Sequence, residues 1–137
     1  MKKTLEVVGA IIVKDGRILA VKRGASKNLQ VAYKYEFAGG KIEEGESKKE
    51  ALIRELREEM SMEIEPIKEF CDVVYEYEDV FVHLYVFLCR ALSDFVLKEH
   101  VDSKWLLQKE LFDVEWAPAD YDILKKLQKA DFSQYGL

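Results

Sequence analysis

The chain has 137 residues, the usual size of one domain, and 49% of them are hydrophobic, which is enough for a sizeable core. The formal net charge is −5 and the lysines and arginines are scattered, which argues against nucleic acid polymers and acidic membrane surfaces as partners. The apolar runs are too short to span a bilayer, and the basic start "MKKTLEVVGAIIV" lacks a small-residue cleavage site. We therefore expect one cytoplasmic domain, residues 1–137, that is a monomer or homodimer without a membrane partner.

The chain begins with a predicted β-hairpin. The segments "LEVVGAIIV", residues 5–13, and "ILAVKR", residues 18–23, are rich in β-forming residues, and the turn sequence "KDGR" joins them. A polar loop follows over residues 24–34, and "YEFAGG", residues 35–40, has the character of a short strand.

The rest of the chain alternates between helices and strands. Residues 47–60 are predicted to form a helix, and residues 69–92 to form two long strands joined by a tight turn. "SKWLL", residues 103–107, is a candidate final strand, and "PADYDILKKLQKA", residues 118–130, a closing helix. The order of elements predicts an α+β domain with helices packed on a mixed sheet, rather than a doubly wound parallel fold.

The two cysteines leave two interpretations open. Cys71 and Cys89 lie about equally far from the predicted turn near Glu78–Val80, so they are candidates for cross-strand neighbours. The alternative is a pair of small buried thiols that stay reduced. Neither belongs to a CxxC or Cys/His cluster, so no zinc site is predicted.

The helix over residues 47–60 carries a start signal and an apolar stripe. "SKKE" is a capping box, in which the Ser47 hydroxyl accepts from the backbone of Glu50 and the Glu50 side chain accepts in return. At about 100° per residue, Leu52, Leu56 and Met60 share one face, which we expect to pack against the core.

A separate flank of this helix is acidic. Glu55, Glu58 and Glu59 are spaced i, i+3 and i+4, and like charges at these spacings mildly destabilise a helix. One interpretation is a solvated charged face, balanced by neighbours such as Arg54 and Arg57. The other is that the carboxylates converge on a hard divalent cation such as Mg²⁺, which prefers oxygen ligands and keeps waters and substrate phosphates in its shell.

The stretch "FAGGKIEEGESKKEALIRELREEM" and the two residues that follow resemble the Nudix box of the Nudix hydrolases. Eight positions match the family pattern at its spacing: Gly40, Glu46, Arg54, Glu55, Leu56, Glu58, Glu59 and Met62. The pattern has glycine where this chain has Ser61. We expect that serine to destabilise the helix end by about 1 kcal/mol if its backbone is left-handed.

A wider resemblance, to the MutT-like branch of the family, covers nearly the whole chain through "AVKRGA", "YEFAGGKIE", "LKEH" and "APAD". It implies a Nudix α/β/α sandwich with a central mixed β-sheet. It also implies Mg²⁺-dependent hydrolysis of a nucleoside triphosphate, with Mn²⁺ as a substitute, to the monophosphate and pyrophosphate. The implied substrates are 8-oxo-dGTP or a cytosine or non-standard nucleotide, and the implied role is nucleotide-pool sanitation.

The resemblance also implies which residues act. The metal ligands would be Glu55, Glu58, Glu59, Glu99 and the carbonyl of Gly39. Glu55 would be the general base, with Arg54 and Glu58 as the other catalytic residues and Glu46 supporting the helix beside the structural Gly40. The substrate would be bound by Arg23, Phe37, Lys41 and Asp120.

Several of these positions have simpler interpretations. Arg54 and Lys41 are candidates for surface charges, the two glycines for a tight bend, and Glu99 for an ordinary polar loop. Asp120 is a candidate N-cap of the closing helix, because an aspartate there accepts a backbone N–H.

The remaining aromatic and histidine residues give weaker signals. Tyr33, Tyr35, Phe37, Tyr75 and Tyr77 alternate at strand spacing, so we expect most of them in the core or on a sheet face. Neither His83 nor His100 has acid and nucleophile partners at an interpretable spacing, so no histidine-based triad is predicted.

Two other functions remain as alternatives. One is a Nudix hydrolase of nucleotide sugars or dinucleotides, and the other is a non-catalytic Nudix domain that senses a ligand. The presence of every box acid disfavours the second.

Overall fold

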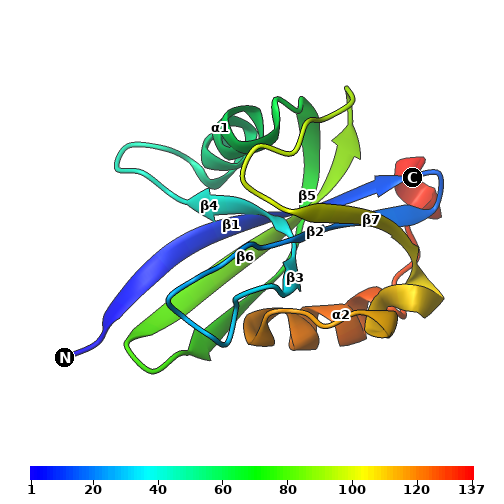
Figure 1. The fold of residues 1–137 in the computed structure, drawn as a ribbon. Coiled ribbons are helices and arrows are strands. Elements are labelled where there is room, and N and C mark those ends of the chain that lie inside the picture. Colours follow the sequence, from blue (N-terminus) through cyan, green and yellow to red (C-terminus); the bar gives the residue numbers. More distant parts are fainter.

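A computed structural model describes residues 1–137, which form a mixed seven-stranded sheet with one helix on each face (Figure 1). The main path of the sheet has the order β3-β2-β1-β6-β5, with β4 paired to β1 and β7 paired to β2. The elements are β1 Lys3–Lys14, β2 Arg17–Lys22, β3 Tyr35–Glu36, β4 Ala38–Lys41, α1 Lys48–Met60, β5 Ile64–Glu76, β6 Val80–Ala91, β7 Asp102–Leu107 and α2 Tyr121–Leu127. The predicted α+β class with a central mixed sheet is confirmed.

Strand β1 is the centre of the sheet. It runs parallel to β6 from Lys3↔Val80 to Val13↔Arg90, and antiparallel to β2 and β4. The turn between β1 and β2 has positive φ at Asp15 (52°) and Gly16 (75°), as the favoured two-residue hairpin turn requires. The predicted N-terminal hairpin is therefore confirmed.

The second hairpin, β5–β6, is longer than predicted, because β5 already begins at Ile64. Its register places Cys71 opposite Val86 and Cys89 opposite Pro66. The proposed cross-strand cysteine pair is therefore wrong. Both thiols are free, and Cys89 is buried.

Each face of the sheet has its own hydrophobic core. Alternate side chains of β1 point to opposite faces, so Ala10 and Ile12 pack under α1 while Ile11 and Val13 face α2. The predicted stripe of α1 is confirmed, since its members are fully buried against the sheet: Leu52, Leu56 and Met60. Fully burying a leucine side chain stabilises the fold by roughly 1.5–3 kcal/mol, so this stripe fixes the rotation of the helix.

Helix α1 begins and ends as its sequence predicts. The Glu50 N–H donates to Ser47 Oγ over 3.1 Å, and the Ser47 N–H donates to Glu50 Oε1 over 2.9 Å. At the other end Ser61 has φ 49° and ψ 34°, a left-handed conformation that favours glycine. Its N–H donates to the Arg57 carbonyl over 3.0 Å, which closes the last turn.

The closing helix is shorter than the predicted residues 118–130. A 3₁₀ turn over Pro118–Asp120 precedes α2, which ends at Leu127. Further 3₁₀ turns over Gln108–Asp113 and Ser133–Tyr135 were not predicted.

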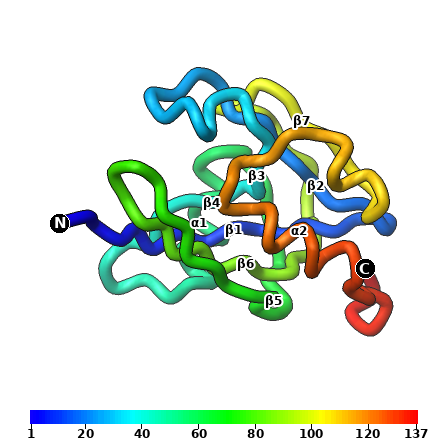
Figure 2. Tube along the Cα trace, turned by 90° about the horizontal axis from the view of Figure 1, so that it is seen from below, coloured from blue at the N-terminus to red at the C-terminus, as the bar shows by residue number.

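The two termini lie at opposite ends of the molecule (Figures 1 and 2). Neither helix has the length and hydrophobicity required to cross a bilayer.

Candidate active site

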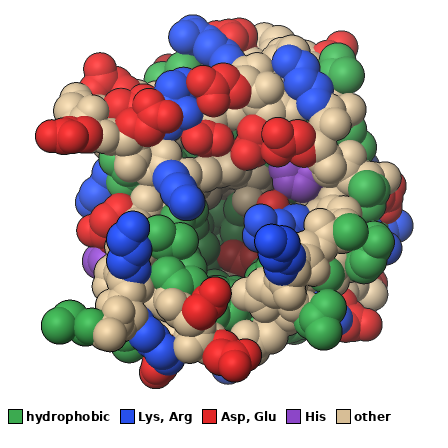
Figure 3. Space-filling view, turned by 60° about the vertical axis from the view of Figure 1, so that its left-hand side comes forward, with side chains coloured by type: hydrophobic (Ala, Val, Ile, Leu, Met, Phe, Trp, Pro, Cys, Tyr) green, Lys and Arg blue, Asp and Glu red, His purple; other side chains and the backbone are tan.

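A cavity of about 1100 Å³ opens on one side of the sheet, beside α1 and the 3₁₀ turn that precedes α2. Figure 3 shows this hollow, with a largely hydrophobic interior and acidic side chains gathered along one edge. Nine of the predicted site residues line it: Arg23, Phe37, Gly39, Gly40, Lys41, Glu55, Glu59, Glu99 and Asp120. Residues that lie far apart in the sequence therefore meet in one cavity.

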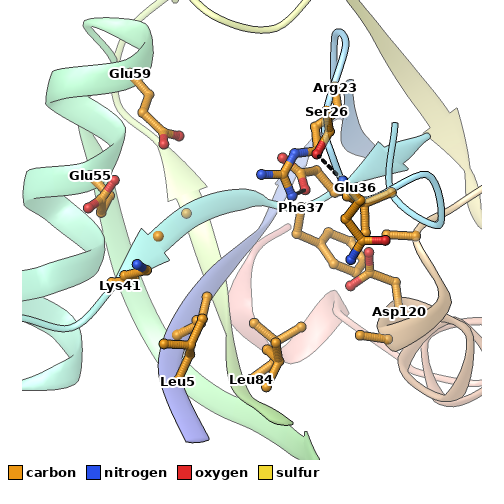
Figure 4. Close-up of a pocket in the computed structure, with 18 of the residues that line it drawn as sticks. Leu5, Arg23, Ser26, Glu36, Phe37, Lys41, Glu55, Glu59, Leu84 and Asp120 are labelled. Carbon is orange, nitrogen blue, oxygen red and sulfur yellow. Dashed lines mark hydrogen bonds and ion pairs between the residues drawn. The ribbon is translucent and has the colours of Figure 1, made fainter. Parts of the chain in front are cut away.

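The acidic end of the cavity is formed where α1 passes over β4. Figure 4 shows Glu55 and Glu59 on the side of α1 that faces the cavity. A β-carbon on Gly40 would overlap the Glu55 carboxylate, and one on Gly39 would overlap the Val8 carbonyl. The interpretation of these glycines as a tight bend is wrong, because they lie within β4 and allow the helix and β1 to approach closely.

One carboxylate oxygen of Glu59 lacks a hydrogen-bond partner. Its Oε2 atom is buried and makes no hydrogen bond. Burial, and then the carboxylates of Glu55 and Glu99, raise the pKa of Glu59 to about 8. An acid in this position is neutralised either by a proton or by a cation, so these residues fit a divalent metal ion.

Arg54 connects the box residues around the acidic end. Its guanidinium donates to Glu46 Oε2 over 2.6 Å, to Glu55 Oε1 over 2.9 Å and to the Lys41 carbonyl over 3.0 Å. These contacts orient Glu55 and fix the loop before the helix. They lower the pKa of Glu46, chiefly through the hydrogen bond from Arg54. Arg54 is therefore not a free surface charge.

Glu58 does not join the other predicted metal ligands. Its side chain is 61% exposed, lies outside the cavity lining and accepts a hydrogen bond from Arg54 over 3.1 Å. The helical period explains this, because Glu59 lies about 40° from Glu55 around the helix, whereas Glu58 lies about 60° away on the other side. No three acidic, histidine or cysteine side chains converge into an all-protein metal cage. Mg²⁺ commonly uses one or two carboxylates together with waters and phosphates, so such a cage is not required.

The opposite end of the cavity is largely apolar and contains one acid, Asp120. Asp120 is 3% exposed and faces walls that include Phe37, Ala117 and Ala119. Asp120 occupies the N-cap position of α2, as the alternative interpretation predicted, but the predicted capping hydrogen bond is wrong, since its side chain accepts none from the helix. Burial, and then the charge of Glu36, raise the pKa of Asp120 well above its usual range.

Most of the five aromatic residues lie in the core or on a sheet strand, as predicted. Tyr35 and Phe37 are buried, and the Phe37 ring packs on Trp116 with its centroid 4.9 Å away. The exception is Tyr33, which is 58% exposed in the loop. Tyr77 also lines the cavity, and its hydroxyl accepts from the Ala119 N–H over 3.4 Å. Its strand spacing did not distinguish it from a core tyrosine.

The prediction missed several polar lining residues, which are Ser26, Asn28, Glu36, Glu43 and His100. The Arg23 guanidinium lies 3.6 Å from one Glu36 oxygen, and His100 Nε2 lies 3.0 Å from the other. The glutamate and the histidine are 64 residues apart, so no local pattern indicates their contact.

Comparisons with known proteins agree with this geometry. The sequence pattern of the NUDIX domain matches residues 3–127. The chain belongs to the Nudix family. It is 36% identical to the CTP pyrophosphohydrolase of Escherichia coli K12, over 90% of each chain. It is 32% identical to the 8-oxo-dGTP diphosphatase of the same organism, over 94% of this chain and 99% of the relative.

A solved Nudix structure has the same fold. The MutT protein from Methanosarcina mazei Go1 superimposes with a TM-score of 0.83 at 26% identity, covering 93% of this chain and 95% of that one. The chain is thus a Nudix hydrolase domain with MutT-like relatives, and the fold that the box implied is confirmed.

Proposed function

We propose that this protein hydrolyses a nucleoside triphosphate to the monophosphate and pyrophosphate with the help of Mg²⁺. The observation that carries the proposal is one cavity with an acid at each end: Glu59 has a buried, unpartnered oxygen among other acids, and Asp120 is buried among apolar groups. A metal-bound triphosphate joined to a base complements both ends. The similarity to a CTP pyrophosphohydrolase and an 8-oxo-dGTP diphosphatase supports the same substrate class.

The acidic end would hold the metal. Glu55, Glu59, Glu99 and the Gly39 carbonyl supply oxygen ligands, the type that Mg²⁺ and Mn²⁺ accept. When bound, Mg²⁺ neutralises phosphate charge and lowers the pKa of a water.

The chain's own residues would orient the substrate and move the proton. Glu55 would accept the proton of the attacking water, since the hydrogen bond from Arg54 fixes one oxygen and leaves the other for the cavity. Arg23 and Lys41 line the cavity between its two ends, where cationic side chains would contact the phosphates. Glu58 would act through Arg54, because it faces away from the cavity.

The apolar end would bind the base. The raised pKa of Asp120 favours its protonated form, which donates through O–H and accepts through C=O. That pair complements an edge with one donor beside one acceptor, such as N4–H₂ and N3 of cytosine or N7–H and O6 of 8-oxoguanine. Unmodified guanine presents two acceptors, N7 and O6, at the latter edge, so Asp120 would discriminate against it there.

The test is a panel of substrates with purified protein, assayed separately for pyrophosphate and phosphate. The panel contains CTP, dCTP, 8-oxo-dGTP, dGTP, a nucleotide sugar and a dinucleotide. We expect pyrophosphate and monophosphate from a cytosine or 8-oxoguanine triphosphate, and no turnover in excess chelator. Direct release of phosphate, turnover without divalent cation, or a strong preference for a nucleotide sugar or dinucleotide would overturn the proposal.

This activity would place the protein in sanitation of the cytoplasmic nucleotide pool. The substrate would be its main partner, and the single domain would act as a monomer or homodimer.

A further inference from the structure

The Glu36 carboxylate contacts two neighbouring segments that line the cavity. Its Oε2 lies 3.0 Å from His100 Nε2, and its Oε1 lies 3.6 Å from Arg23 Nη1. A carboxylate accepts but does not donate when ionised, so the Nε2 atom of the imidazole carries the hydrogen. Figure 4 shows Arg23 beside Glu36 at the cavity wall.

His100 depends on this one contact. Its side chain is only 6% exposed, and its Nδ1 atom is buried without any partner in the chain. Glu36 is therefore the only protein group that hydrogen-bonds the ring. Loss of the contact would leave a buried polar side chain without a partner, which favours rearrangement of the segment that carries it.

The segment around His100 also carries Glu99, and hydrogen bonds before and after Glu99 attach this segment to the rest of the fold. Before Glu99, the Lys98 ammonium donates to the Glu58 carbonyl at the end of α1 over 3.4 Å. After it, the Val101 N–H donates to the Lys22 carbonyl of β2 over 2.9 Å. Figure 2 shows this segment beside the loop that follows β2. The His100 side chain supplies the attachment to the cavity wall.

Glu36 also lies between the two functional ends of the cavity. Its charge contributes to the raised pKa of Glu59 at one end and of Asp120 at the other. His100 and Arg23 are the two groups that lie close to the Glu36 charge.

We propose that Glu36 and His100 form a positioning pair, which holds Glu99 at the metal end of the cavity and directs Arg23 toward the substrate phosphates. This inference rests on the proposed function for the identity of the metal and phosphates. It assigns no contact with the reacting atoms to either residue.

The test compares two substitutions at one position. His100→Gln keeps an N–H donor at a similar reach, whereas His100→Leu keeps the volume without the donor. Mn²⁺ binding is measured without nucleotide from the electron paramagnetic resonance signal of the free ion. Loss of a residue that orients a metal ligand commonly weakens metal binding by 10–100-fold, so we expect a loss of about 10-fold in the leucine variant and near-normal binding in the glutamine variant.

A double variant shows whether His100 acts through Glu99. If it does, His100→Leu adds little to the loss already caused by Glu99→Gln, because the two changes remove the same ligand. Full additivity of the two losses would overturn the inference, as would equal Mn²⁺ binding by the leucine and glutamine variants.

The other histidine provides a matched control. His83 Nε2 lies 2.7 Å from Asp72 on the sheet face, outside the cavity lining. His83→Leu makes the same chemical change to a histidine–carboxylate pair, and we expect unchanged Mn²⁺ binding. A loss equal to that of His100→Leu would overturn the assignment to this pair.

A variant at the other partner tests the Arg23 half. Glu36→Gln retains an oxygen for His100 but removes the charge that attracts Arg23. We expect a severalfold increase in the KM of the triphosphate, with kcat and Mn²⁺ binding little changed. An unchanged KM would overturn this half. Failure of the wild-type protein on every triphosphate would instead overturn the proposed function, so the two failures are distinguishable.

Discussion

Glu59 and Asp120 are acids at opposite ends of one cavity, and they differ in burial and in what surrounds them. Both have a pKa raised chiefly by burial. Glu59 is partly buried and lies close to the carboxylates of Glu55 and Glu99, whereas Asp120 is fully buried among apolar walls. The two surroundings create two different requirements. A cation satisfies the first acid, and a hydrogen-bonding base edge satisfies the second.

The comparison has an energetic side. A buried polar group without a partner destabilises a fold by roughly 1–3 kcal/mol, so two such acids are unfavourable in the free protein. Perturbed acids of this kind concentrate at functional sites, where a ligand supplies the missing partner. Each of the first three predictions below alters one end of the cavity and leaves the other intact.

The largest effect is expected at the acidic end, from Glu55→Gln. The amide keeps the shape but removes the charge that accepts a proton and binds metal, so kcat should fall by on the order of 10²-fold or more. Discrimination between bases should be unchanged, since the apolar end is intact. The matched variant is Glu58→Gln. Because the Glu58 side chain contacts Arg54 outside the cavity, this variant should lose much less kcat. A greater loss for Glu58→Gln, measured by steady-state kinetics, would contradict the geometry.

The second effect is at the apolar end, from Asp120→Ala. Removing a hydrogen-bonding group that recognises the base should reduce discrimination by about 1–3 kcal/mol, or roughly 5–150-fold in the ratio of kcat/KM between matched and mismatched bases. The Mg²⁺ dependence should stay as in the wild type. Asp122→Ala, at an exposed position two residues away, serves as the control. An equal fall for every base would exclude Asp120 from base recognition.

The third effect concerns stability and pH. Glu59 has a raised pKa of about 8 in the folded state, so the folded protein binds a proton that the unfolded chain releases near its ordinary pKa. In chelator, the stability due to this proton is fully present at low pH and declines from about pH 5 to pH 8. Glu59→Gln should flatten this decline, and Mg²⁺ should offset it in the wild type. Melting temperatures across this range provide the measurement. The same decline in both proteins would contradict the assignment to Glu59.

The smallest effect is expected at Ser61, where the Nudix box has glycine. A substitution there should change stability but not catalysis. Ser61→Gly should stabilise the protein by about 1 kcal/mol, because φ is 49° at this position and glycine adopts it without strain. Activity and base preference should not change. Denaturant unfolding measures the gain in stability. A change in kcat would contradict the prediction, because it would show that the C-terminal end of α1 influences the acidic end of the cavity.

Local periodicity accounts for what was predictable from the sequence. The 3.6-residue period placed Leu52 in the core and Glu55 with Glu59 on another flank, and the capping box located the start of α1 at Ser47. The same period separates Glu58 from Glu59 around the helix, but which of the two faces the cavity depends on the tertiary packing of α1.

Long-range contacts account for what was missed. The pairing of Glu36 with His100 depends on β3 and a loop 64 residues later in the chain. The 3₁₀ turn before α2 places Asp120 at the N-cap position, but its side chain lines the cavity and makes no capping hydrogen bond. Tyr77 lies at the end of the β5–β6 hairpin, and only the tertiary fold turns its ring toward the apolar end of the cavity.

The central claim is that Glu59 has a buried oxygen without a partner in the chain, which a cation satisfies. Its most direct test is the proton release that accompanies metal binding. Calorimetric titration with Mg²⁺ at neutral pH, repeated in buffers of different ionisation enthalpy, measures the number of protons released per Mg²⁺ bound. A pKa of about 8 means that Glu59 is largely protonated in the free protein at that pH, so metal binding should release up to about one proton. In Glu59→Gln this release should disappear, whereas in Asp120→Ala it should persist. Binding of Mg²⁺ without proton release, or with equal release in Glu59→Gln, would contradict the account.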